Sequence, residues 1–459
     1  MNSKELADQL FGFDLKKRDQ WYELLKDPVF VPVYNYPSWH ETREHPYRKL
    51  KKITDAKLMS VKDFIDNPHN IFCAHEFIGM VCGSTAVKFT VQFNLFGGSC
   101  LALHTARHAH IFDKIDNLDM CGCFCLTELG YGNNAVKMET TVTYDEKTKE
   151  FIVDTPTTLS QKYWISNGFK HANYSLVFGQ TIVKGKNEGV NAFLVPIRDK
   201  DMKPLSGMTI NDMGVKFGLN GVDNAALKFN KVRIPRENMM NRYADVDAEG
   251  NFHSDVKNIP SRFFKVTERL LSGRLCIAGF ALGAAKAAAY IAVKYAQQRL
   301  SIGPEGESTV AIFDYQLQQN ALMPLMARTF ALQVLYNWAR DIYKTPTGYE
   351  HEVLSICCIV KTMAGWNCER IASVGRERCG GMGFLANARF ADYMHTAHAA
   401  LTAEGDNRVL MTKIMKDMIT NVTKNGLKLP QPRLNVQTQI STFNDVSQIE
   451  TLADLMRFR

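Results

Sequence analysis

The sequence predicts a multidomain α+β protein that is mostly α-helical, with a helical part, a β-rich part and a second helical part in that order. Three observations predict this class. Residues 1–117 mix aromatic and charged stretches with helical patches. Residues 118–235 carry short alternating runs rich in β-branched side chains, and residues 236–425 carry long apolar-periodic stretches. The changes after residues 117 and 235 therefore mark the predicted domain boundaries.

The first and last segments carry the weakest structural signals. Helical patches are predicted over residues 3–10 and 61–67 of the N-terminal helical domain. Residues 426–459 are polar and contain Pro430 and Pro432. We expect them to form a polar tail that wraps the surface or is partly mobile.

The central residues are typical of a β domain. Alternating apolar and polar residues predict strands over residues 140–144, 151–153, 174–178 and 191–196, with Gly, Asn and Asp turns between them. Cys121, Cys123 and Cys125 alternate as one face of a further strand, where apolar packing is favoured over metal binding.

The residues after Pro235 predict a helical bundle. Residues 267–299 are apolar-periodic and rich in Ala, and Gly279 and Gly283 would let a second helix pack closely. Further helices are predicted over residues 312–343, 350–376 and 404–423. Four such helices joined by loops predict a four-helix bundle.

Composition excludes several classes of protein. The 459 residues are 46% hydrophobic and include 55 basic and 47 acidic residues, for a formal charge of +8. This is an ordinary globular composition without the clustered basic residues of a nucleic-acid-binding surface, although an anionic small ligand fits. The eleven cysteines show no disulfide framework, which predicts an intracellular compartment. No signal peptide and no uncharged apolar run of 18 residues is found, so we expect no membrane span.

Four short motifs could carry chemistry. They are Thr127-Glu-Leu-Gly-Tyr-Gly-Asn-Asn134, Lys162-Tyr-Trp-Ile-Ser-Asn-Gly168, Cys379-Gly-Gly-Met-Gly-Phe384 and Leu401-Thr-Ala-Glu-Gly-Asp-Asn407. The glycines would let the backbone approach a ligand, and Trp164 could form the wall of a site for a planar ligand. Ser166 would lie on the same side of a strand as Trp164 and could donate a hydrogen bond.

Each motif alone also has an ordinary structural interpretation. Gly-rich segments are commonly turns, Trp164 could belong to the core, and Glu404 could be a solvated acid in a first helical turn. His104, His108 and His110 could suggest a metal, but no H-E-x-x-H pattern accompanies them, and a polar helix face is favoured.

The motifs together are more specific, because they occur in one order with Phe193-Leu-Val-Pro-Ile-Arg198, Asp212-Met-Gly-Val-Lys-Phe-Gly218 and Val232-Arg-Ile-Pro-Arg-Glu-Asn-Met239. This order resembles the acyl-CoA oxidase and acyl-CoA dehydrogenase superfamily, and the peroxisomal acyl-CoA oxidases most. The resemblance covers residues 90–425 well and the first 90 residues weakly. It implies a barrel-like β domain. This sequence differs from the oxidases, which carry a second C-terminal helical domain beyond the bundle.

The resemblance implies an FAD enzyme acting on an acyl-CoA, with Glu404 as the catalytic base. It assigns FAD binding to Thr127, Gly132, Trp164, Ser166, Arg299, Gln316, Gly380, Gly381 and Gly383. It assigns acyl-CoA binding to Asn133, Arg274 and Gly405. Arg299 would reach the FAD of a neighbouring subunit, which implies a homodimer or homotetramer that shares the FAD site.

The implied chemistry requires these residue types. The α-proton of a thioester is weakly acidic, so its removal needs a carboxylate in a dry pocket, where burial raises the proton affinity. FAD would accept the β-hydrogen as hydride, and the protein would supply orientation and electrostatics. The expected product is a trans-2-enoyl-CoA.

Two alternatives to an oxidase remain. We expect oxygen as the electron acceptor, giving hydrogen peroxide, whereas Ser166 is dehydrogenase-like and would favour an electron-transfer flavoprotein. The chain could also be a structural subunit of a larger assembly, against which the presence of Glu404, Trp164 and Arg299 argues. The resemblance implies a peroxisomal protein, although the chain lacks the Ser-Lys-Leu ending, and a mitochondrial location is the alternative.

Overall fold

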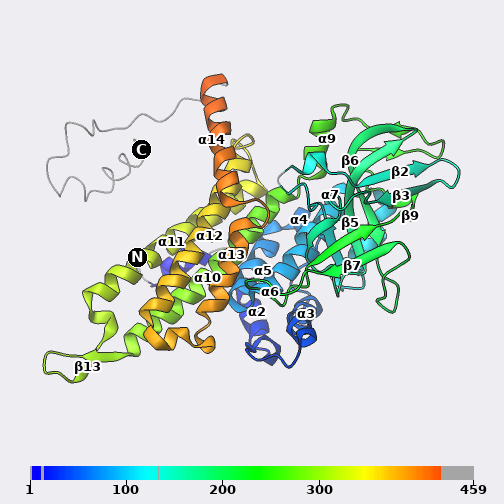
Figure 1. The fold of residues 1–459 in the computed structure, drawn as a ribbon. Helices are drawn as coiled ribbons and strands as arrows, with labels where there is room; N and C mark the ends of the chain where they lie inside the picture. Colours follow the sequence, from blue (N-terminus) through cyan, green and yellow to red (C-terminus); the bar gives the residue numbers. More distant parts are fainter. Residues whose placement is uncertain (1–2, 12–14, 133, 425–459) are drawn as a thin grey trace. The chain divides into compact units, whose positions relative to one another are not determined.

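The computed structural model describes residues 3–11, 15–132 and 134–424 (Figure 1). The chain forms two compact units, Met1–Asn407 and Arg408–Arg459. Helix α14 (Asn407–Lys424) belongs to the second unit except for its first residue. The predicted tail, residues 426–459, lies outside the described residues.

The N-terminal part of the first unit is helical, as the sequence predicts. Its helices are α1 (Ser3–Phe11), α2 (Leu15–Leu25), η1 (Pro28–Phe30), α3 (Trp39–Asp55), α4 (Asp63–Asp66), α5 (Pro68–Val81), α6 (Gly83–Phe89), η2 (Thr90–Gly97), α7 (Gly98–Leu103), η3 (Ala106–Ile111) and α8 (Phe112–Asp116). The segment η2 is a π-helix that continues α6 directly, a distortion that is frequent at functional sites.

The β part consists of two packed sheets. Its strands are β1 (Gly122–Cys125), β2 (Thr141–Asp145), β3 (Glu150–Asp154), β4 (Lys162–Ile165), β5 (Tyr174–Val183), β6 (Lys186–Pro196), β7 (Met208–Asp212), β8 (Ala225–Phe229) and β9 (Val232–Pro235). The larger sheet has the order β1-β5-β2-β3-β9 with β6 on β5, and the smaller has the order β4-β8-β7. Apolar side chains from both sheets share one core, which includes Cys123 and Cys125. These cysteines therefore pack as the alternation suggests.

The bundle of the first unit consists of α10 (Leu270–Gln298), α11 (Gln316–Lys344), α12 (Val353–Arg378) and α13 (Phe390–Thr402), seen as long neighbouring helices in Figure 1. The sequence did not predict α13, and the predicted fourth helix is α14 of the second unit. Helix α13 buries Phe390, Tyr393 and Ala397, a helical spacing that its small and polar residues obscure.

Close contacts join the helical parts. A Cβ atom on Gly79 of α5 or Gly283 of α10 would overlap the backbone of the other helix, so these glycines allow the two backbones to touch. Glu76 of α5 accepts a hydrogen bond from Arg18 of α2 at 2.7 Å and pairs with Lys286 of α10. The bundle and the N-terminal helices therefore share one core.

Helix α10 is also apolar enough to meet a length and composition test for a membrane span. The helical segment concerned is Ile259–Gln298, whose most apolar window of 18 residues has a mean hydropathy of 1.7. Within it, 67% of the most apolar window is buried inside the protein, as in a core helix.

Candidate active site

Glu404 lies in the loop between α13 and α14, not inside a helix. Its backbone is in the left-handed region at φ 55°, followed by Gly405 at φ 113°. Both carboxylate oxygens are buried without a hydrogen-bond partner, although the residue as a whole is half-buried. Burial raises the pKa of Glu404 to about 8, against the opposing charges of Arg274 and Lys361. A strained residue that holds an unpaired buried carboxyl group is a candidate catalytic base.

Three residues that the sequence did not single out surround this loop. A Cβ atom on Gly273 of α10 would overlap Glu404 Oε2, so only glycine leaves room for the carboxylate. The same point lies 2.7 Å from Nδ2 of Asn94, a buried residue of η2. Lys361 of α12 donates to the Gly405 carbonyl at 2.6 Å and to Asn407 Oδ1 at 2.8 Å.

The predicted acyl-CoA residues have different outcomes. Arg274 lies beside Gly273 on α10 and acts on Glu404 through its charge, and its Nε is buried without a partner. Gly405 adjoins the base. Asn133 lies outside the described residues.

Thr127 is positioned by a buried ion pair beside it. Lys162 Nζ donates to Glu128 Oε1 at 3.0 Å, and both side chains are fully buried. Glu128 also accepts the backbone N–H groups of Glu139 at 2.8 Å and Thr140 at 3.0 Å. Thr127 is half-buried and its carbonyl accepts from Tyr163 N–H at 2.9 Å, which ties the two motifs together. Gly132 is exposed with open space around its Cβ position.

Trp164 and Ser166 do not lie on the same side of a regular strand. The pairing of β4 with β8 is irregular between Lys162 and Ile165, because Trp164 has φ 61°. Ser166 follows the end of the strand, and its Oγ accepts from Asn224 Nδ2 at 3.0 Å, which leaves its O–H free to donate. The Trp164 side chain is 58% exposed, so it is available to a planar ligand and is not a core residue.

The continuous segment α6–η2 contacts both the loop that follows Ser166 and the residues around Glu404. Lys88 of α6 pairs with Asp223, donates to Asn167 Oδ1 at 3.5 Å and lies 3.0 Å from His171 Nδ1, so it holds the loop that follows Ser166. Asn94 of η2, six residues later, lies beside Glu404. One helical segment therefore fixes the Trp164 loop and the surroundings of the base.

The remaining predicted FAD residues lie at the other end of α10. Arg299 is exposed at the C-terminal cap of α10, about 39 Å along the axis from Gly273. The hairpin of β12 (Leu300–Ile302) and β13 (Ser308–Ala311) brings Gln316 to the same end. Gln318 donates to the Arg378 carbonyl at 3.1 Å, which places the loop of Gly380, Gly381 and Gly383 there as well.

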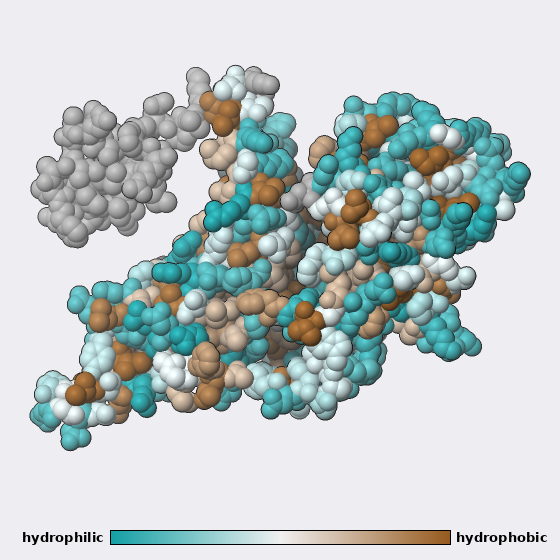
Figure 2. All heavy atoms as spheres, viewed as in Figure 1, coloured by the Kyte–Doolittle hydropathy of each residue, from teal (hydrophilic) through white to brown (hydrophobic). Residues whose placement is uncertain are grey.

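Apolar side chains are exposed at this end, which we call the hairpin end (residues 299–318 and 379–385). Leu317 is 77% exposed and Phe384 is 81% exposed, and Ile302 and Met382 are also exposed. Figure 2 shows apolar side chains at the tip that carries β13 in Figure 1. A single copy therefore separates Glu404 from Arg299 and leaves apolar surface beside Arg299.

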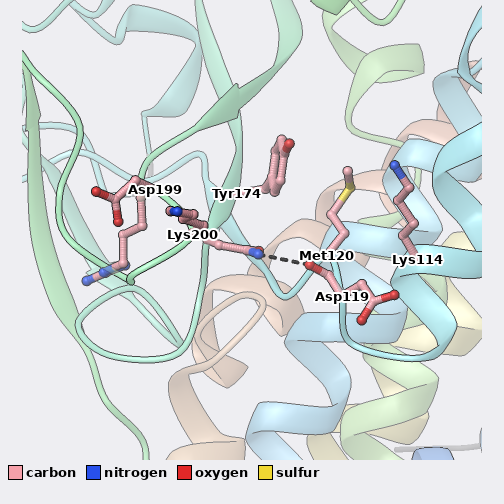
Figure 3. A pocket seen from close by; sticks show the side chains of 8 residues that line it. Lys114, Asp119, Met120, Tyr174, Asp199 and Lys200 are labelled. Atoms are coloured by element: carbon pink, nitrogen blue, oxygen red, sulfur yellow. Dashed lines mark hydrogen bonds between the residues drawn. The ribbon is translucent and has the colours of Figure 1, made fainter.

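A surface pocket of about 320 Å³ lies elsewhere (Figure 3). It is lined by Lys114, Asp119, Met120, Asn173, Tyr174, Arg198, Asp199 and Lys200. Gly122 and Tyr174 are paired at the start of β1 and β5, whereas Thr127 follows the other end of β1. This pocket therefore contains none of the predicted site residues.

Among the described residues, no group of three or more His, Cys, Asp or Glu side chains could hold a metal ion. The histidines singled out in the sequence contact backbone carbonyl oxygens. His104 Nδ1 lies 2.6 Å from the Leu101 carbonyl and His108 Nε2 lies 3.0 Å from the Glu237 carbonyl.

Comparison with known proteins identifies two family regions. Residues 123–232 match the acyl-CoA dehydrogenase middle domain, and residues 268–419 match the C-alpha1 domain of acyl-CoA oxidase. Acyl-coenzyme A oxidase 2, peroxisomal, of Arabidopsis thaliana is 37% identical over 380 residues, which is 80% of this chain and 55% of that protein. A second Arabidopsis thaliana protein, provisionally named acyl-coenzyme A oxidase 3.2, peroxisomal, is 32% identical over 96% of this chain and 70% of its own length.

A solved structure has the same fold. Acyl-CoA oxidase-1 of Caenorhabditis elegans, complexed with FAD and ATP, superposes with a TM-score of 0.76 at 25% identity over 92% of this chain and 64% of that one. The architecture is that of the acyl-CoA dehydrogenases and oxidases. The chain belongs to the acyl-CoA oxidase family. It spans about half the length of the first of these relatives.

Proposed function

We propose that this chain is an FAD-dependent acyl-CoA oxidase that converts an acyl-CoA to a trans-2-enoyl-CoA, with Glu404 as the α-proton base. The observation that carries the proposal is the unpaired, fully buried carboxylate of Glu404 in a left-handed loop. The names of the relatives support the substrate class and the reaction.

The residues around Glu404 suit proton abstraction from carbon. Burial gives the carboxylate a high proton affinity, which brings it closer to that of a weak carbon acid. Arg274 and Lys361 offset part of this effect, so the ionised form remains accessible near neutral pH. The backbone N–H of Glu404 can donate to the thioester oxygen as negative charge develops there.

The residues near Trp164 fit a flavin. FAD is present in the Caenorhabditis elegans relative. The exposed indole of Trp164 offers an apolar wall to a planar ring, and Thr127 and Ser166 offer hydroxyl groups beside it. Bound FAD supplies the hydride acceptor for the substrate β-hydrogen.

A second copy of the chain completes the cofactor site in this proposal. Arg299, Gln316 and the Gly380–Phe384 segment lie at the hairpin end, far from the Glu404 of the same chain. The exposed apolar side chains at that end suit burial against a partner. The proposed assembly is a homodimer or homotetramer.

Oxygen is the proposed electron acceptor, with hydrogen peroxide as the second product, because the relatives are named oxidases. Their names also support a peroxisomal location, and the mitochondrial alternative has no support among them. The free hydroxyl hydrogen of Ser166 favours the second candidate, a dehydrogenase that passes electrons to an electron-transfer flavoprotein.

Anaerobic addition of acyl-CoA thioesters of increasing chain length tests the desaturase. The flavin absorbance of the purified protein is expected to bleach with at least one of them. Bound FAD that keeps its colour with every chain length would refute the proposal. Glu404→Gln is expected to retain FAD and lose bleaching, whereas Glu249→Gln, an exposed control, is expected to bleach like the parent protein.

Readmission of air separates the two acceptors. Rapid return of the flavin colour with stoichiometric hydrogen peroxide supports the oxidase. Slow return that an added electron-transfer flavoprotein accelerates supports the dehydrogenase.

A further inference from the structure

Asn94 occupies an unusual position beside Glu404. It lies within the apolar run Phe93-Asn94-Leu95-Phe96 of the π-helix η2 and is fully buried. A buried amide without hydrogen-bond partners costs free energy, so buried side-chain amides are normally hydrogen-bonded.

One half of the Asn94 amide is satisfied and the other is not. Ser272 Oγ of α10 donates to Asn94 Oδ1 at 2.8 Å. Asn94 Nδ2 is buried and has no hydrogen-bond partner among the described residues. Ser272 Oγ also lies 2.9 Å from the Arg269 carbonyl oxygen, so two acceptors compete for its single hydrogen. In the structure the oxygen of the Asn94 amide lies on the Ser272 side, and its nitrogen lies towards Gly273.

The unpaired N–H groups lie beside the unpaired carboxylate. The Cβ position of Gly273 is 2.7 Å from Asn94 Nδ2 and overlaps Glu404 Oε2, so both groups adjoin the same small volume over α10. Two unpaired buried groups, one able only to donate and the other a ready acceptor, thus lie next to each other without a bond between them. A small rotation of the Glu404 side chain would join them.

We propose that Asn94 is a positioning residue whose amide N–H is reserved for the ionised carboxylate of Glu404. When the proton is absent, Asn94 Nδ2 donates to Oε2 and directs the other oxygen towards the substrate. When Glu404 holds the α-proton, this bond weakens. The inference rests on the proposed role of Glu404 and adds a residue that prepares the base for the reaction.

The surrounding charges leave room for such a donor. Charges from Arg274 of α10 and Lys361 of α12 act on the carboxylate, and the carboxylate acts in turn on Cys276 of α10. Asp406 of the same loop acts on Lys361. Lys361 already donates to Gly405 and Asn407, and Arg274 acts through its charge. Asn94 contributes a directed donor from η2, the element packed on the remaining side.

The test is the pH dependence of kcat/KM in the FAD-containing enzyme. Asn94→Leu keeps the approximate side-chain shape and removes the donor. Loss of a hydrogen bond to the charged carboxylate favours its protonated form. The acidic limb of the pH profile of kcat/KM is therefore expected to shift upward by about one to two pH units, and kcat/KM at pH 7 is expected to fall by roughly tenfold or more. Asn94→Asp adds a negative charge and is expected to shift the limb further.

A matched control is Asn367→Leu. Asn367 is a fully buried asparagine of α12 that donates to Thr329 Oγ1 at 2.9 Å, away from Glu404. The acidic limb of the Asn367→Leu enzyme is expected to coincide with that of the parent enzyme. Ser272→Ala, which leaves Asn94 in place but removes its anchor, is expected to shift the limb part of the way. These substitutions keep the proposal testable if Asn94→Leu does not fold.

A readout without substrate separates this inference from the proposed reaction. The infrared band of a buried protonated carboxyl group, identified by its loss in Glu404→Gln, is expected to titrate at higher pH in Asn94→Leu than in the parent protein. The role of Asn94 would be overturned if the carboxyl group titrated at the same pH in Asn94→Leu and in the parent protein. It would also be overturned if Asn94→Leu left the acidic limb of kcat/KM unshifted while Glu404→Gln was inactive. A protein without any flavin bleaching would instead refute the proposed function and leave the infrared comparison to decide on Asn94.

Discussion

The Lys361 ammonium group donates to the carbonyl oxygen of Gly405 at 2.6 Å, directly behind the carboxylate-bearing residue. Desolvation lowers the pKa of Lys361 to about 8, and the nearby Glu404 opposes this shift. The bond holds Glu404 and Gly405 in left-handed backbone conformations that are unfavourable for a non-glycine residue. Lys361 therefore acts on Glu404 in two ways, through its charge and through the loop.

Lys361→Met should impair Glu404 in both ways. Loss of the positive charge is expected to raise the pKa of Glu404, and loss of the bond frees the loop. We expect kcat/KM at pH 7 to fall by roughly 10- to 100-fold, with an acidic limb moved to higher pH. Lys294→Met, on the exposed face of α10, serves as the control and should leave the pH profile in place. A profile of Lys361→Met equal to that of the parent would contradict this role.

Gly273→Ala tests the space that the carboxylate occupies. Alanine is the better helix former by about 1 kcal/mol, so helix propensity alone predicts a more stable protein. The added Cβ would overlap Glu404 Oε2 and displace it. A displacement of about 1 Å can cost roughly 100-fold in rate, so we expect a loss of kcat of that order with the fold retained.

Gly365→Ala of α12 is the matched helical substitution. Its Cβ would lie 3.4 Å from the nearest side-chain atoms, an ordinary van der Waals contact. Stopped-flow bleaching and circular dichroism of both variants separate displacement of the base from loss of structure. Equal rates in the two variants would show that the overlap over Gly273 is relieved without harm to the base.

The sequence predicted the regular elements well and the surroundings of the base poorly. Alternation and β-branched residues over residues 174–178 and 191–196 predicted β5 and β6, and the structure buries both faces of these strands over most of these residues. Motif order led to Glu404 and Trp164, but not to their geometry. Trp164 has φ 61°, a conformation that only the surrounding structure imposes.

The partners of Glu404 could not be predicted because they come from distant segments. Asn94, Gly273 and Lys361 are brought together by packing of η2, α10 and α12. The one available signal was Asn94 itself, a polar residue in an otherwise apolar run. Gly273 looked like one more small residue of an Ala-rich helix.

The Glu128–Lys162 pair is expected to support the fold near Thr127. Both side chains are fully buried, and Lys162 also donates to the Phe178 carbonyl at 2.7 Å. Glu128→Ala would leave a buried ammonium group without its counter-ion, and we expect a loss of about 3–5 kcal/mol in the free energy of unfolding. Asp55→Ala, which breaks the exposed pair with Lys51, should change it by less than about 1 kcal/mol. Denaturant unfolding measures both, and similar losses would contradict the structural role of the pair.

Glu404→Gln should stabilise the protein while it removes the base. Burial raises the pKa of Glu404 from 4.5 to about 8 in the folded state. Between these values the folded protein binds a proton that the unfolded chain releases, so the contribution of this group to stability decreases as the pH rises. Below about pH 4.5 the carboxyl group is protonated in both states and costs nothing. Glutamine does not ionise, so the gain in the free energy of unfolding from Glu404→Gln should be near zero at pH 4.5 and grow to at most about 5 kcal/mol above pH 8.

Thermal unfolding of the parent, Glu404→Gln and the exposed control Glu249→Gln, at pH 5 and pH 8.5 with equal FAD content, measures this trend. A stabilisation by Glu404→Gln that is the same at both pH values would mean that Glu404 does not titrate in the raised range.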